Sequence, residues 1–81
     1  ALDAIEASGQ LPDDFLARHI RHDWGCLTDD DRRLNRAALK NGSRILSAYE
    51  TRQGIRLWVI TDAIDGAGHR PSTTILLPQE Y

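Results

Sequence analysis

The sequence has no features that predict a disulfide, a signal segment or a membrane span. Its 81 residues include a single cysteine, Cys26, so no internal disulfide can form. A lone thiol suits a reducing cytoplasm. No apolar run approaches the about 18 residues that a membrane helix requires, and no basic-then-apolar signal segment opens the sequence. We therefore expect a cytoplasmic protein that makes no contact with membranes.

Motifs for phosphate loops and covalent catalysis are also lacking. The glycine-containing segment 66–68 has no Gly-Lys-Ser/Thr ending and does not open an expected helix. Cys26 has His22 near it in sequence as a base, but no oxyanion-hole signal accompanies the pair. The sequence predicts a protein that is not an enzyme and needs no cofactor.

The length predicts one small domain over residues 1–81. A chain this short buries only about 60% of the surface that its unfolded form exposes. A second copy could supply further burial, so we expect that the chain can form a homodimer.

Three helices are expected in the first half, over residues 1–8, 12–24 and 29–41. Pro12 suits the first position of the second helix, whose apolar residues recur at steps of three to five up to Trp24. Gly25 should stop that helix. Thr28 is a good N-cap for the third helix, which should end at the pair 41–42.

Three strands follow, over residues 44–50, 55–61 and 72–78, because β-branched and aromatic runs alternate there with turn residues. The sequence thus predicts an α+β fold with about three N-terminal helices packed on a three-stranded antiparallel sheet. The expected core residues are Phe15, Ile20, Leu34, Leu57 and Val59. Both faces of the second strand are apolar, so one face should meet the helices while the other is covered differently or exposed around Trp58.

The net charge of −2 is unevenly distributed along the chain. Residues 1–31 carry eight acidic residues against two arginines, whereas residues 32–81 carry eight basic residues against four acidic ones. The acidic half supplies the candidate partner-binding residues Asp13, Asp14, Asp23, Asp29, Asp30 and Asp31. Such carboxylates could compete for a site that normally takes DNA. The simpler interpretation is that aspartate stabilises helix N-termini.

A basic stripe is the competing signal. Arg32, Arg36 and Lys40 recur every four residues along the third expected helix, and Arg44 follows. The stripe could contact phosphates. It could equally be a solvated helix face that is partly paired with the neighbouring aspartates.

A metal site is a further alternative. His19, His22 and Cys26 are spaced three and four apart, with Asp23 beside them and His69 as a fourth ligand. The expected helix break at Gly25 argues against this set. The simpler interpretation is two exposed histidines and one buried thiol.

Several segments resemble a family of small, mostly uncharacterised proteins encoded on bacterial plasmids and phages. They are Asp23-Trp24-Gly25, Asn35 with Ala38-Leu39, and the runs 42–49, 54–61 and 73–81. The likeness extends from Leu11 onward, although the loop 62–72 is longer than is usual. No catalytic residue is known for the family, so none is carried over.

A small acidic chain of this kind also resembles the anti-CRISPR proteins. That resemblance implies a non-enzymatic phage or mobile-element inhibitor that binds a type I CRISPR surveillance complex (Cascade) and blocks recognition of target DNA. The surfaces of such complexes that hold a phosphate backbone are basic, so an acidic face is the expected complement. The six aspartates named above would make the contacts, and we expect no tight direct binding to duplex DNA. The alternative is a nucleic-acid-binding accessory protein of a plasmid or phage that uses the basic stripe.

Overall fold

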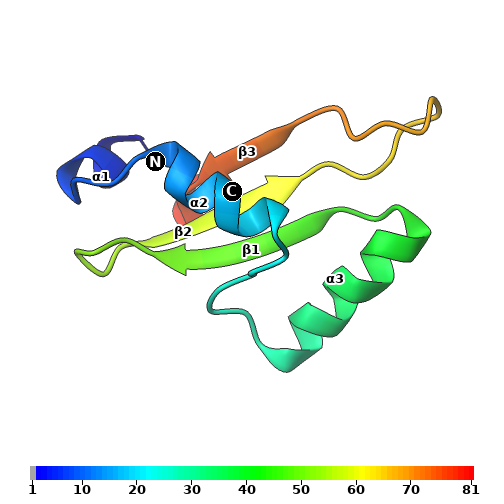
Figure 1. Cartoon of the computed structure of the whole chain (residues 1–81), viewed down its shortest axis with the longest axis horizontal. Coiled ribbons are helices and arrows are strands. Elements are labelled where there is room, and N and C mark those ends of the chain that lie inside the picture. Colours follow the sequence, from blue (N-terminus) through cyan, green and yellow to red (C-terminus); the bar gives the residue numbers. More distant parts are fainter. Residues whose placement is uncertain (1) are drawn as a thin grey trace.

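The computed structural model describes residues 2–81 (Figure 1). Its elements are α1 (Leu2–Ala7), α2 (Pro12–Ile20), α3 (Asp29–Asn41), β1 (Ile45–Glu50), β2 (Arg56–Thr61), β3 (Thr73–Leu76) and a short 3-10 helix, η1 (Pro78–Glu80). The strands form one antiparallel sheet in the order β1-β2-β3. The prediction of three helices followed by a three-stranded antiparallel sheet is therefore confirmed. None of the helices in residues 2–81 is long and apolar enough to cross a membrane.

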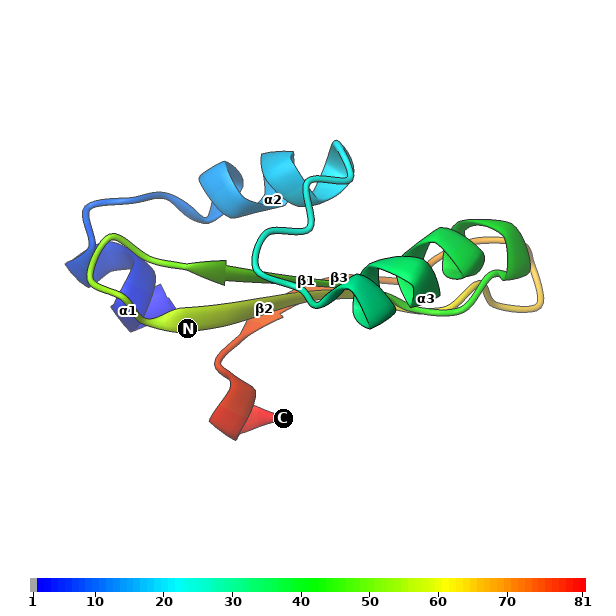
Figure 2. The same cartoon turned by 90° about the horizontal axis from the view of Figure 1, so that it is seen from below.

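The main core lies between α2 and one face of the sheet (Figure 2). Because side chains alternate along a strand, Tyr49, Leu57 and Val59 share this face, and each is at most 1% exposed. Phe15 of α2 and Ile5 of α1 complete the buried cluster. The prediction of a buried Phe15, Leu57 and Val59 is confirmed.

Helix α3 lies beside the outer edge of β1, on the side away from β2, rather than on the face of the sheet (Figure 1, Figure 2). A second, smaller cluster joins it to the sheet through Ala38, Trp24 and Ile45. The expectation that all three helices pack on the sheet therefore needs correction for α3, which extends the sheet layer sideways.

Two of the five expected core residues are exposed. Ile20 is 74% exposed and Leu34 is 67% exposed. Helix α2 buries Phe15 and His19 and ends at Ile20, while α3 turns Asn35 and Ala38 inward. The prediction of a buried Ile20 and Leu34 is wrong because it assumed that apolar side chains alone mark the inward face.

Helix α2 also ends four residues earlier than predicted, at Ile20 instead of Trp24. His22 adopts a left-handed conformation with φ of 63°, and Asp23 N–H donates to the Arg18 carbonyl at 2.9 Å. This turn directs Trp24 back into the core, where it is 5% exposed.

The second face of the sheet is only partly covered. Trp58, Ile60 and Leu76 are half-buried on this face, and the C-terminal η1 turn lies below it (Figure 2). Tyr81 contacts Trp58 edge to face, with ring centroids 5.7 Å apart. The sequence left open whether this face is covered or exposed. The structure shows both, because the C-terminal turn covers part of the face and an apolar patch remains.

Candidate functional site: the outer face of helix α3

Helix α3 has well-defined ends. Thr28 is extended, and its Oγ1 accepts a hydrogen bond from Asp31 N–H at 3.2 Å, as the sequence predicted for an N-cap. At the other end Gly42 has φ of 80° and donates its N–H to the Ala38 carbonyl at 2.9 Å. This left-handed conformation favours glycine. Both predicted boundaries of the helix are confirmed.

A side-chain amide joins α3 to the sheet. Asn35 Nδ2 donates to the Leu46 carbonyl at 2.6 Å, and Asn35 Oδ1 accepts from Leu46 N–H at 3.1 Å. The amide thus takes the place of a neighbouring strand at the edge of β1. Asparagine has a low helix propensity, and its presence in a helix interior is the one sequence signal that could have indicated this role.

Two arginines hold α3 to the loops around it. Arg32 Nη2 donates to the Gly25 carbonyl at 2.5 Å, and its Nε donates to the Leu27 carbonyl at 3.3 Å. At the C-terminal end, Arg70 Nη2 donates to the Ala38 carbonyl at 3.1 Å. A guanidinium is favourable there because the C-terminal end of a helix carries partial negative charge. The position of α3 is therefore fixed by hydrogen bonds more than by apolar packing.

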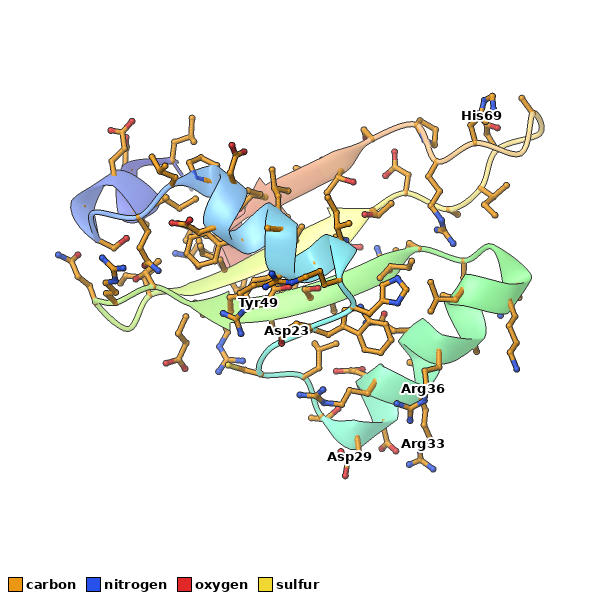
Figure 3. All side chains as sticks on the ribbon, viewed as in Figure 1. Asp23, Asp29, Arg33, Arg36, Tyr49 and His69 are labelled. Carbon is orange, nitrogen blue, oxygen red and sulfur yellow. The ribbon has the colours of Figure 1, made fainter. Side chains whose placement is uncertain are left out.

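The outer face of α3 is consequently open to solvent (Figure 3). In this 13-residue helix only Asn35 and Ala38 are buried. We define the outer face by its exposed residues, which are Asp29, Asp30, Arg33, Leu34, Arg36, Ala37, Leu39, Lys40 and Asn41. It is acidic at its start and basic toward its end. An exposed leucine among these charges, Leu34, lines a groove of about 150 Å³ between α3 and β1.

The candidate aspartates fall into separate groups. Asp13 and Asp14 begin α2, which lies on the sheet, whereas α3 begins beyond the edge of β1 (Figure 1). Asp14 accepts a hydrogen bond from Leu11 N–H at 2.9 Å and so supports its own helix. The two helix starts therefore do not merge into one acidic surface.

The three aspartates at the start of α3 differ in exposure and in ion pairing. Asp30 forms an ion pair with Arg33, one turn later. Asp31 is half-buried, and Asp29 is exposed at the tip of the helix (Figure 3). Within residues 2–81 no ion pair involves Asp29, which leaves its carboxylate available to a partner.

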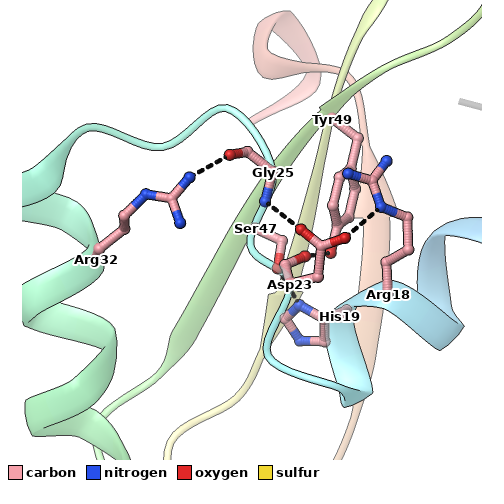
Figure 4. A network of polar contacts seen from close by, with 7 residues as sticks. All are labelled: Arg18, His19, Asp23, Gly25, Arg32, Ser47 and Tyr49. Carbon is pink, nitrogen blue, oxygen red and sulfur yellow. Dashed lines mark hydrogen bonds and ion pairs between the residues drawn. The ribbon is translucent and has the colours of Figure 1, made fainter.

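Asp23 belongs to a structural network between α2 and β1 (Figure 4). Its carboxylate accepts from Arg18 Nε at 2.9 Å and from Gly25 N–H at 3.4 Å. The hydrogen bond from Arg18 holds the pKa of the Asp23 carboxyl below its usual value. The Arg18 guanidinium also lies over the Tyr49 ring, 4.5 Å from its centroid, and Tyr49 donates its hydroxyl to the Asp23 carbonyl at 2.5 Å. Asp23 therefore holds the turn that ends α2.

The basic stripe is not uniform. Arg32 is half-buried and tied to the loop as described above. Arg44 donates to the Tyr81 hydroxyl and lies 5.4 Å from the centroid of that ring. Arg36 and Lys40 are exposed on α3, and no ion pair within residues 2–81 involves either of them. Two of the four positive charges are therefore free for a ligand.

The residues of the metal alternative do not converge. No group of three or more His, Cys, Asp or Glu side chains among residues 2–81 is placed to hold a metal ion. His22 stacks on Trp24, with ring centroids 5.7 Å apart, and His69 lies in the distant loop between β2 and β3 (Figure 3). The expected burial of Cys26 and exposure of His19 are both reversed, since Cys26 is exposed and His19 is 6% exposed.

Two hydroxyls satisfy the buried histidine. The ring of His19 lies 2.5 Å from Ser47 Oγ through Nδ1 and 2.7 Å from Thr61 Oγ1 through Nε2. Burial, followed by the nearby charge of His22, lowers the pKa of His19. Ser47 has no exposed surface, so it is not accessible to a substrate. This pair serves packing between α2 and the sheet.

Comparisons of the chain with protein-family models, with curated proteins and with solved structures find no match.

Proposed function

We propose that the chain acts by binding another protein through the outer face of α3. In this proposal it is a non-enzymatic inhibitor from a phage or other mobile element, and its partner in the bacterial cytoplasm is a type I CRISPR surveillance complex, as the sequence resemblance implies. The observation that carries the proposal is the exposure of α3, which buries only Asn35 and Ala38 of its 13 residues. A helix that contributes so little to the core is available for a partner.

The charges on the outer face of α3 support a protein partner. Asp29 and Asp30 lie at its start, while Arg36 and Lys40 lie two to three turns later. The acidic start would contact the basic surface that holds target DNA. A charge pattern of both signs fixes the orientation of a docked helix, and the exposed Leu34 adds apolar contact area between the two charged ends.

The alternative function is direct nucleic-acid binding by an accessory protein of a plasmid or phage. The specific observation in its favour is that Arg36 and Lys40 are exposed and outside the ion pairs of residues 2–81. Two phosphate contacts would give a salt dependence with a slope of only about −2. The nearby acidic start of the same helix would oppose the binding of a polyanion.

Charge reversal at the two ends of α3 distinguishes these functions. We expect Asp29→Lys with Asp30→Lys to abolish inhibition of target-DNA binding by a purified type I complex in a mobility-shift assay. Asp3→Lys with Glu6→Lys, at two exposed residues of α1, makes the same change in charge and is the matched control, which should still inhibit. Because an aspartate near a helix start contributes about 0.3–1 kcal/mol, the melting curve of each variant must show a folded protein.

The basic pair provides the opposite arm of the experiment. Arg36→Glu with Lys40→Glu should weaken inhibition less than the aspartate variant does, because these residues orient the docked helix and do not contact the basic surface, and it should not change DNA binding by the chain alone. Retained inhibition by the folded aspartate variant would contradict the proposal. Loss of duplex binding only in the basic-pair variant would support the alternative.

A further inference from the structure

The two edges of the sheet are treated differently by the rest of the chain. At the β1 edge, Asn35 binds both backbone groups of Leu46. Next to it, Ala48 N–H donates to the Trp24 carbonyl at 3.1 Å, and Cys26 N–H donates to the Ala48 carbonyl at 2.7 Å. These contacts occupy the groups that would otherwise template another strand, so the β1 edge is closed.

The β3 edge is open. Asp62 N–H donates to the Ser72 carbonyl at 3.0 Å, which makes this a hydrogen-bonded pair across β2 and β3. In an antiparallel ladder such pairs alternate, so Thr74 and Leu76 bond to β2, whereas Thr73 and Ile75 direct their N–H and carbonyl groups outward. Within residues 2–81 no hydrogen bond reaches these outward backbone groups, and no element lies beyond β3 (Figure 1).

The open edge carries none of the usual protection against pairing. Residues 71–79 contain no charged side chain, although natural edges are commonly guarded by charges. Thr73, Thr74 and Ile75 are β-branched, which favours strand pairing. A neutral edge neither repels an identical strand nor offers charges that would select a charged peptide.

We infer that this edge binds the β3 strand of a second copy, giving a symmetric dimer with a continuous six-stranded antiparallel sheet. Because the β1 edge is closed within each chain, pairing through β3 ends at two copies and cannot propagate into a filament. The two-fold axis passes beside Thr74. Thr73 of each copy then faces Ile75 of the other, and each such pair exchanges two backbone hydrogen bonds.

A hydrogen bond at Leu77 limits the register on the C-terminal side. Leu77 N–H already donates to Glu80 at 2.6 Å, so the ladder cannot be centred further toward the C-terminus without losing this bond. A groove of about 450 Å³ reaches Thr74 from the half-covered face, with Ile60, Leu76 and Tyr81 among its lining residues. In the dimer the two grooves adjoin across the axis, so apolar contacts add to the four backbone bonds.

The test uses position 74, where the two-fold axis brings identical side chains together. Thr74 is exposed. In the dimer, Thr74→Lys or Thr74→Glu places like charges directly opposite each other and should raise the dimer dissociation constant about fivefold or more. An equimolar mixture of the two variants should restore a dimer. Ala17→Lys, on the exposed side of α2, is the control and should dimerise as the unmodified chain does. Analytical ultracentrifugation over a concentration series measures the unmodified chain, the three variants and the mixture.

Hydrogen exchange identifies the surface involved. The amides of Thr73 and Ile75 should exchange rapidly in dilute protein and slowly in concentrated protein, whereas those of Thr74 and Leu76 should be protected in both. A chain that stays monomeric at its highest soluble concentration would overturn the inference. So would a dimer in which the Ile75 amide still exchanges rapidly, because that dimer must use another surface.

Discussion

Asn35 carries the contact that places α3, and its replacement tests whether a side-chain amide can act as a strand partner. In Asn35→Ala both hydrogen bonds to Leu46 disappear, and two backbone groups in a half-buried place lose their partners. An unsatisfied buried polar group costs about 1–3 kcal/mol. Water can reach this edge in part, so we expect a total loss of about 2–3 kcal/mol rather than the full sum. For a chain of this size that corresponds to a fall in Tm of about 10–20 °C.

The assay is thermal and urea unfolding followed by circular dichroism. Asn41→Ala is the matched control on the same helix, because Asn41 accepts only an exposed hydrogen bond from Ser43 N–H at 2.9 Å. It should cost less than about 1 kcal/mol. Asn35→Asp can still accept from Leu46 N–H but, when ionised, its carboxylate faces the Leu46 carbonyl. This variant should therefore be less stable than Asn35→Ala at neutral pH and should recover as its carboxyl is protonated. A cost below about 0.5 kcal/mol for Asn35→Ala would refute the reasoning.

The remaining predictions concern backbone fit and the buried histidine. Gly25→Ala should prevent native folding, seen as loss of the cooperative melt, because its Cβ would lie 2.1 Å from the Ala48 carbonyl oxygen. Gly54→Ala, at φ of 80° in open space, should cost only about 1–2 kcal/mol in urea unfolding. Since the pKa of His19 is lowered in the folded protein, the unfolded state takes up more protons as pH falls below its reference value of about 6.5. The urea midpoint should be highest above that pH and should decline as pH falls toward the folded pKa. His19→Gln should flatten this dependence, and an unchanged slope in that variant would show that another group is responsible.

The ends of α3 and the three strands could be predicted because they depend on local chemistry. Thr28 and Gly42 act at the ends of α3 through hydrogen bonds to residues within four positions. The strands begin and end within two residues of the expected positions, since runs of β-branched and aromatic residues are bounded there by turns. These signals require no knowledge of the rest of the fold.

The placement of α3 could not be predicted in the same way. Apolar periodicity put Leu34 in the core, whereas the helix turns Asn35 toward β1 and leaves Leu34 exposed. The gain comes from two backbone groups of Leu46, a residue 11 positions away. Apolar periodicity takes account of apolar side chains alone. It therefore cannot reveal a polar side chain that binds the backbone at the outer edge of a strand.

In the candidate site, too, the sequence pattern could not show which charged residues are bound within the fold and which are exposed. Arg32 and Arg36 are identical in type and one turn apart, but the first donates to the Gly25 carbonyl while the second is exposed. The difference depends on the loop before α3, which folds back only because Gly25 can adopt φ of 70° against β1. A nucleic-acid function would therefore have to rest on Arg36 and Lys40. Asp29 and Asp30 lie at the start of the same helix. A protein surface of mixed charge can contact both these aspartates and the two basic residues, whereas a line of phosphates can contact the basic residues alone.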